Sequence, residues 1–452
     1  MSAATGIDPR LGTASGPGAD VLVRGARLLD PRGRIDRTGD ILVARGAIAA
    51  VGDAGTLEPP PGAEEVDAEG LLALPAFVDP HVHLRTPGRE DEEDIASGTR
   101  AAAAGGFCAI LAMPNTEPVV DSAPVLRSLQ ERACAEACIP TGFLAAITRG
   151  QEGELLTEMG ELADAGAVAF SDDGLPVRSA GVMRQALQYQ RLSGGVLALH
   201  EEDPTLSGDG VMHEGTVSAL LGLAGIPSVS ESTMVARDAQ LAGDEDARIH
   251  IQHLSARGSV EAVEAAKAAG VRISAEATPH HLLLTDDDVR SLDTNFKMNP
   301  PLRSEDDRQA IVDGLRSGTI DCVATDHAPH AREEKEQPFE LAPMGVTGLE
   351  TAFAALHSGL VEPGVIPLET LALRLTSGGE PFGIAAPSLA PGSPANVCLI
   401  DLDAGWEVGD PGYESRSSNC AFAARRLKGR VRMTIAGGAV AYRERSFAIG
   451  AV

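Results

Sequence analysis

The sequence lacks an excess of basic residues. Its 37 Lys and Arg residues stand against 65 Asp and Glu residues, which gives a formal net charge of −28. A nucleic-acid-binding protein needs a basic face, so we exclude nucleic acid as a partner. The acidic surface also repels anions, so an anionic small-molecule substrate would need cationic side chains inside its site.

The sequence also lacks a membrane-spanning run and a secretory signal. Its most apolar stretch, 101–113, is interrupted by Gly105 and Gly106 and is too short to cross a bilayer. Residues 1–18 are rich in Gly, Ala, Ser and Pro, without a basic start followed by an apolar block. We expect them to form a disordered tail, and we predict a cytoplasmic protein with no membrane partner.

Cysteine is sparse, and the spacing of the cysteines indicates no zinc-binding motif. Among the six cysteines, Cys134 and Cys138 lie four residues apart on a predicted helix, without a second pair or a nearby histidine. We therefore expect small, reduced side chains, as in a reducing compartment.

Two strand-rich flanks surround a longer central segment. The runs with strand character, separated by Gly, Pro and Asp turns, are 21–29, 40–51, 65–74, 395–401 and 431–442. Because chain ends often lie close together, we expect residues 19–74 and 386–452 to form one small β-sandwich domain.

The central segment, residues 75–385, alternates short apolar runs with stretches of helical periodicity such as 122–137 and 259–269. The apolar runs end near residues 83, 113, 147, 171, 200, 253, 275 and 325. Eight strands that alternate with helices predict an α/β fold, a (β/α)₈ TIM-like barrel. In such a barrel the chemistry takes place at the carboxyl ends of the strands.

Imidazoles and carboxylates gather at these predicted strand ends. His81 and His83 lie two residues apart, so their side chains point to the same face of a strand. The other candidates are Asp172 or Asp173, His200, His253 and Asp326. Each alone has a structural explanation, such as a core histidine, an Asp-Gly turn or a helix N-cap. Gathered around one barrel mouth, they predict a site for zinc, with manganese, cobalt or iron as alternatives.

Four motifs give the sequence a family resemblance. They are VDPHVHLR at 78–85, MPNT at 113–116, NFKMNPPLR at 295–303 and TDHAPH at 325–330. With them the chain resembles the type I dihydroorotases of the amidohydrolase superfamily, from about residue 20 to the C-terminus. Ala76 and Thr86 depart from the family pattern, where Gly and Glu are usual, and neither departure removes a ligand.

The resemblance implies a ligand set, a catalytic residue and a substrate. The metal ligands would be His81, His83, Asp173, His200, His253 and Asp326, holding one or two zinc ions. Asp326 would accept a proton from the attacking water and pass it to the leaving nitrogen in the interconversion of L-dihydroorotate and N-carbamoyl-L-aspartate. The substrate-binding residues would be His83, Arg85, Asn115, Asn299, His330, Met344 and Gly345.

Arg85 offers the planar, two-pronged donor that a carboxylate needs, and its alternative role is a salt bridge at the strand end. Residues 331–343 would be either a mobile loop over the site or a solvated connection.

Two other functions remain as alternatives. Hydantoinases, dihydropyrimidinases and allantoinases use a carboxylated lysine at the end of strand four, but none of the four lysines lies near Ser171. A non-catalytic scaffold for aspartate transcarbamoylase would be expected to lose ligands, and all six positions are filled. The sequence leaves two assemblies open, a homodimer and a complex with aspartate transcarbamoylase.

Overall fold

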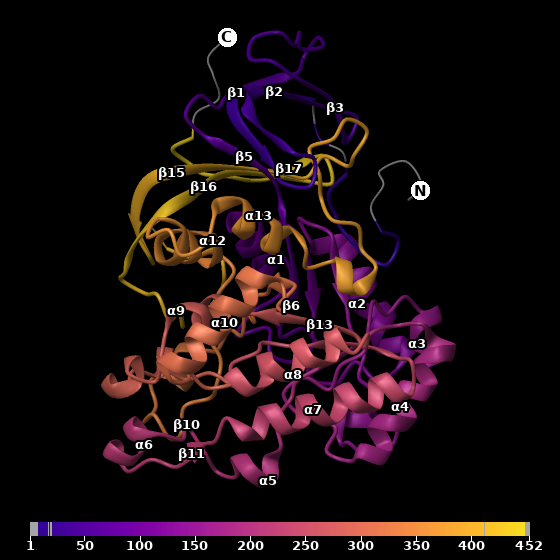
Figure 1. Cartoon of the computed structure of the whole chain (residues 1–452). Helices are drawn as coiled ribbons and strands as arrows, with labels where there is room; N and C mark the ends of the chain where they lie inside the picture. The colour runs from indigo at the N-terminus through magenta and orange to yellow at the C-terminus, as the bar shows by residue number, and fades with distance from the viewer. Residues whose placement is uncertain (1–7, 17, 19, 411, 448–452) are drawn as a thin grey trace.

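The structure is a computed structural model that describes residues 8–16, 18, 20–410 and 412–447. It contains a sheet domain built from both ends of the chain and a barrel built from the centre (Figure 1). Among the described residues, no helix has the length and apolar character needed to cross a membrane.

Residues 8–16 differ from the disordered tail that we expected. Gly12 exchanges backbone hydrogen bonds with Thr141, and Arg10 donates to the carbonyl of Phe382 at 3.1 Å. These contacts hold the segment against the barrel. The rest of the predicted tail, residues 1–7 and 17, lies outside the described residues, apart from Gly18, whose N–H donates to the carbonyl of Gly438.

The sheet domain is one eight-stranded sheet in the order β17-β16-β15-β5-β1-β2-β3, with β4 beside β1. Its strands are β1 (Val21–Asp30), β2 (Ile35–Ala44), β3 (Ala47–Gly52), β4 (Glu64–Asp67), β5 (Leu72–Pro75), β15 (Val397–Glu407), β16 (Arg426–Ala436) and β17 (Ala439–Arg443). β15 pairs antiparallel with β5, which joins the C-terminal strands to the N-terminal ones.

Alternating side chains give this sheet two apolar faces. In β15, Val397 and Leu399 join a small core inside the domain, whereas Cys398 and Ile400 pack into the main core with the barrel. The sheet therefore contributes one face to each of two cores, because successive residues of a strand point to opposite faces.

The predicted strand over 40–51 is a hairpin. Its turn residues, Arg45 and Gly46, have φ values of 53° and 80°, as a two-residue turn between twisted strands requires.

The barrel predicted for the centre of the chain is confirmed. Its parallel strands are β6 (Phe77–Val82), β7 (Phe107–Ala112), β8 (Thr141–Phe143), β9 (Leu197–Leu199), β12 (Arg248–Ile251), β13 (Arg272–Ala277) and β14 (Cys322–Val323). The fourth position is a single bridging residue, Phe170, which pairs with Ala145 and Leu197. A bridge between Val82 and His327 closes the ring.

Helices surround the barrel, and α7 and α8 run side by side along it in Figure 1. The helices that alternate with the barrel strands or follow the last one are α1 (Ile95–Ala104), α2 (Ala123–Glu136), α3 (Met159–Asp164), α4 (Ala180–Ser193), α7 (Val229–Asp244), α8 (Arg257–Ala268), α10 (Glu305–Ser317), α12 (Ala352–Leu356) and α13 (Leu368–Thr376). The helices predicted over 122–137 and 259–269 are α2 and α8. Short elements carry the loops: α5 (Pro204–Ser207), β10 (Met212–His213), α6 (Thr216–Leu221), β11 (Gly225–Ile226), α9 (Pro279–Leu283) and α11 (Arg332–Lys335).

Local sequence sets the helix ends. α10 shows this well, because Ser304 accepts a hydrogen bond from the amide of Asp307 and acidic residues fill the first turn. The helix ends at Gly318, whose φ of 93° suits a residue without a side chain.

Candidate metal centre

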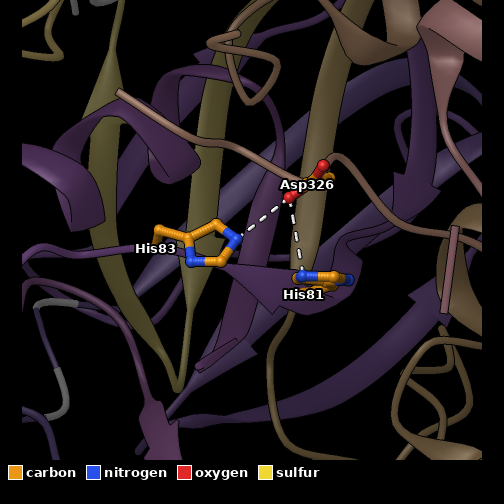
Figure 2. Close-up of side chains that lie close together, drawn as sticks. All are labelled: His81, His83 and Asp326. Atoms are coloured by element: carbon orange, nitrogen blue, oxygen red, sulfur yellow. Dashed lines mark hydrogen bonds and ion pairs between the residues drawn. The ribbon is translucent and has the colours of Figure 1, made fainter. Parts of the chain in front are cut away.

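The structure brings all six predicted ligands together at the carboxyl ends of the barrel strands. Asp326 Oδ1 lies 3.0 Å from His83 Nε2 and 3.5 Å from His81 Nε2, as Figure 2 shows. The same His81 Nε2 atom lies 3.5 Å from Asp173 Oδ1, which lies 3.6 Å from His253 Nε2. Asp173 thus bridges the two halves of the cluster.

His200 completes the group. Its Nδ1 atom lies 2.9 Å from His253 Nε2 and 3.7 Å from Asp173 Oδ1. Asp172 instead turns away from the cluster, where its Oδ1 atom accepts hydrogen bonds from the amides of Ile147 and Thr148 at 2.8 and 3.1 Å. Of the two neighbouring aspartates, the structure therefore places Asp173 with the histidines.

The cluster has the features of a cation site. His81 Nε2 and Asp173 Oδ1 are buried, and neither has a hydrogen-bond partner among the described residues. Unpaired polar atoms are costly in a protein interior, so two of them facing each other call for a bound partner. Ligand atoms lie within 4.8 Å of one another in two sets that share His81, one with His83 and Asp326 and one with Asp173 and His253. Imidazole nitrogens and carboxylate oxygens in such sets fit a divalent metal ion.

The electrostatics keep the carboxylates charged. Burial raises the pKa of Asp326, but the charge of His81 and the hydrogen bond from His83 outweigh it and hold that pKa below its usual range. For Asp173, burial is outweighed in the same way by the charge of His81 and the contact with His253, so its pKa lies well below normal. Both carboxylates are therefore available as anionic ligands.

A buried glutamate that the sequence analysis missed orients His81. Glu276, on β13, has one carboxylate oxygen 2.7 Å from His81 Nδ1 and the other 3.0 Å from His250 Nε2. Burial raises the pKa of Glu276, but the charge of His81 and the hydrogen bond from His250 outweigh it and lower the pKa to about 2. A carboxylate on the far ring nitrogen leaves His81 Nε2 free to face the cluster. In the sequence, the available signal for Glu276 is a charged residue inside an otherwise strand-like run.

Four of the predicted substrate-binding residues form a second group beside the cluster. Arg85 Nη2 lies 3.4 Å from His330 Nε2, which in turn lies 2.8 Å from the carbonyl of Met344. At Gly345, φ is 137° and an added Cβ would lie 2.8 Å from His330 Nε2, so this position has no room for a side chain. Arg85 Nε also pairs with Glu92 at 3.0 Å, so its alternative role as a salt bridge at the strand end is present too.

The two predicted asparagines lie next to different parts of the cluster. Asn115 Oδ1 lies 2.9 Å from His83 Nδ1. Asn299 Nδ2 donates to Glu202 at 2.6 Å, and Glu202 lies 3.3 Å from His200 Nε2. Asn299 Oδ1 is buried without a hydrogen-bond partner among the described residues, so this acceptor remains free.

Comparison with known proteins identifies the family. Residues 70–259 match the family described as Dihydro-orotase-like. A dihydroorotase from Pelotomaculum thermopropionicum is 46% identical over 428 residues, covering 94% of this chain and 99% of that protein. A dihydroorotase from Geobacter metallireducens is 45% identical over 425 residues, covering 94% of this chain and 100% of that protein. The chain belongs to the dihydroorotase family.

The fold is shared more widely than the family. An L-hydantoinase from Arthrobacter aurescens superposes with a TM-score of 0.83 at 25% identity, covering 94% of this chain and 96% of that one. A D-hydantoinase superposes with a TM-score of 0.81 at 23% identity, covering 94% of this chain and 95% of that one, and that likeness shows the fold alone. This member of the dihydroorotase family has Asp173, not a lysine, just after the fourth strand position.

The two departures from the dihydroorotase pattern leave the cluster intact. Ala76 is fully buried and its φ is not positive, so a side chain is tolerated where glycine is usual. Thr86 is buried too, and its hydroxyl has no hydrogen-bond partner among the described residues.

Proposed function

We propose that this chain interconverts L-dihydroorotate and N-carbamoyl-L-aspartate, a step of pyrimidine biosynthesis. The observation that carries the proposal is the identity of 46% with a protein named dihydroorotase over 94% of this chain. Six buried imidazole and carboxylate side chains that converge at the barrel mouth support it, because hydrolysis of a ring amide needs an activated water.

We propose that these six side chains hold one or two zinc ions, or other divalent ions. The ligands are His81, His83, Asp173, His200, His253 and Asp326. A divalent cation in such a site supplies Lewis-acid polarisation and makes water acidic near neutral pH.

In the proposed mechanism Asp326 is the catalytic residue and moves one proton. Its ionised carboxylate accepts a proton from water as the water oxygen bonds to the ring amide carbon. Asp326 then gives that proton to the ring nitrogen as the carbon–nitrogen bond breaks. In the cyclisation direction the same steps run backwards. Because a carboxylate anion is a poor electrophile, cyclisation improves as pH falls and hydrolysis improves as pH rises.

The substrate carboxylate would bind to Arg85, His330 and Asn115. The guanidinium provides a planar donor edge and compensates for the strongly acidic surface of the protein. His83 belongs to the proposed ligand set and also contacts this group, since its two ring nitrogens face Asp326 and Asn115. Asn299 and the backbone at Met344 and Gly345 would contact the ring.

Metal analysis of the purified protein, combined with an absorbance assay of dihydroorotate hydrolysis, tests this function. We expect stoichiometric divalent metal, turnover of dihydroorotate, and loss of turnover after chelation that is restored by zinc. Hydrolysis of hydantoin in preference to dihydroorotate would favour a hydantoinase. A metal-replete protein without turnover would favour a scaffold for aspartate transcarbamoylase.

We further propose a cytoplasmic location, a homodimer and an assembly with aspartate transcarbamoylase. Light scattering of the purified chain, alone and mixed with aspartate transcarbamoylase, tests both assemblies. A monomeric mass in the two samples would refute them.

A further inference from the structure

Two of the four lysines are buried side by side near the proposed substrate site. Lys297 and Lys335 are only 3% and 7% exposed. Neither ammonium group forms an ion pair with a described carboxylate, and both are satisfied by backbone carbonyls. Burying a charged amine without a counter-ion is costly, so these contacts need an explanation beyond packing.

The ammonium of Lys335 joins two separate segments. It donates to the carbonyls of Pro343 and Gly345 at 3.1 and 3.0 Å, and to the carbonyl of Lys297 at 3.3 Å. The amide of Gly345 also donates to the carbonyl of Lys297 at 3.0 Å. One segment is residues 343–345, which include Met344 and Gly345, and the other runs from Lys297 to Asn299.

Lys297 holds the middle of the same loop. Its ammonium donates to the carbonyls of Phe339 and Glu340 at 2.6 and 3.0 Å, and it lies 5.4 Å from the centre of the Phe339 ring. The two lysines therefore fix most of residues 335–345, a stretch that includes much of the segment expected to be either a mobile loop or a solvated connection.

We propose that Lys335 is a positioning residue of the dihydroorotate reaction, which holds the backbone at Met344 and Gly345 in register with Asn299 for binding the substrate ring. The inference rests on the proposed function. It assigns no contact between Lys335 and substrate. The ammonium acts through three carbonyl groups whose positions set the shape of the site.

The number of N–H donors on the Lys335 side chain depends on pH. An ammonium has three N–H groups for the three carbonyls, whereas a neutral amine has only two. Burial and the charge of Lys297 lower the pKa of Lys335 to about 7, and Asp293 opposes them. The charged or titratable groups that line the same cavity as Lys335 are Asp91, Asp293, His330, Arg332, Glu333, Glu336 and Arg416. As pH rises through about 7, one carbonyl loses its donor and the joint between the two segments weakens.

The test uses Lys335→Arg, Lys335→Met and the control Arg332→Met in the metal-replete, full-length protein. Arg332 lies on the same short helix, but its side chain is exposed and pairs with Glu336. We expect KM for dihydroorotate in the wild-type protein to rise roughly threefold or more between about pH 6 and 9. In Lys335→Arg, which stays charged, this rise should disappear. Lys335→Met should have a KM about tenfold above wild type at low pH, with metal content unchanged.

An activity-independent measurement separates this inference from the proposed function. Hydrogen exchange at the amides of Met344 and Gly345 should be faster at high pH in wild type than in Lys335→Arg. If wild type does not turn over dihydroorotate, the proposed function is refuted, but the exchange data still test whether Lys335 holds the backbone at Met344 and Gly345. A KM in Lys335→Arg that rises with pH as in wild type, or equal exchange in the two proteins, overturns the inference. If Lys335→Met does not fold, the arginine variant decides.

Discussion

Replacement of Glu276 by glutamine tests how the cluster is built. The carboxylate is fully buried and lies 2.7 Å from His81 Nδ1 and 3.0 Å from His250 Nε2. Glutamine keeps the shape but removes the charge, and its amide group presents a donor to one of the two rings. His81 then loses the partner that directs its Nε2 atom to the cluster.

The expected cost is a weaker metal site. Loss of such a supporting carboxylate reduces metal affinity by about 10- to 100-fold, which is about 1.4–2.7 kcal/mol. Competition of the purified protein with a zinc chelator at pH 7 measures this directly. Glu350→Gln is the matched control, because that carboxylate accepts amide hydrogen bonds from Glu414 and Ser415 and touches none of the six proposed ligands. Equal zinc affinity in Glu276→Gln and wild type would refute the orienting role.

Three further substitutions test other groups of the structure. Asp326→Asn should lower kcat for dihydroorotate hydrolysis by about 10²–10⁴-fold, with much of the metal retained in elemental analysis, and a near-normal kcat would remove Asp326 from the proton-transfer role. Arg85→Ala should raise KM roughly 10- to 100-fold with a smaller effect on kcat, and an unchanged KM would mean that another group binds the substrate carboxylate. Burial raises the pKa of Glu350 to about 7, so the folded protein binds this proton more tightly than the unfolded chain. The protonated Glu350 side chain therefore contributes fully to stability below the pKa of the unfolded state, and this contribution is lost as pH rises to about 7. Thermal melts of Glu350→Gln should show a smaller loss of stability over that pH interval than melts of wild type. Parallel curves for the two proteins would contradict the raised pKa of Glu350.

The barrel and most of its ligands could be predicted from the sequence for one physical reason. A parallel barrel gathers the carboxyl ends of its strands, so residues such as His81, His200 and Asp326 need no pairwise information to be placed together. The apolar runs before them mark those ends, and the helical periodicity between them fixes the class of fold.

The fourth strand position shows where that reasoning stops. Successive residues of an extended chain point to opposite sides, so only one of Asp172 and Asp173 faces the cluster. The strand is reduced to a single bridge at Phe170, so the sequence offers no alternating pattern from which to choose. In the structure the amides of Ile147 and Thr148 bind Asp172, and this contact between distant segments leaves Asp173 for the histidines.

The same limit explains the hairpin of β2 and β3 and the N-terminal segment. Apolar residues continue on both sides of Arg45 and Gly46, so the run over 40–51 has the composition of one strand. Residues 8–16 have the composition of a loose tail, but backbone hydrogen bonds at Gly12 attach them to Thr141. Backbone pairing of this kind carries no side-chain signature.

Lys297 and Lys335 show most clearly which contacts cannot be predicted from the sequence. In the sequence Lys297 and Lys335 are informative only by their distance from Ser171, which argues against a lysine-bridged metal pair. Their observed partners are five carbonyl groups, and any residue type supplies a carbonyl. A buried ammonium of this kind can be recognised only once the loop is folded around it. The scarcity of lysine in an acidic chain then has a structural meaning, because half of its lysines shape the backbone next to the proposed substrate site.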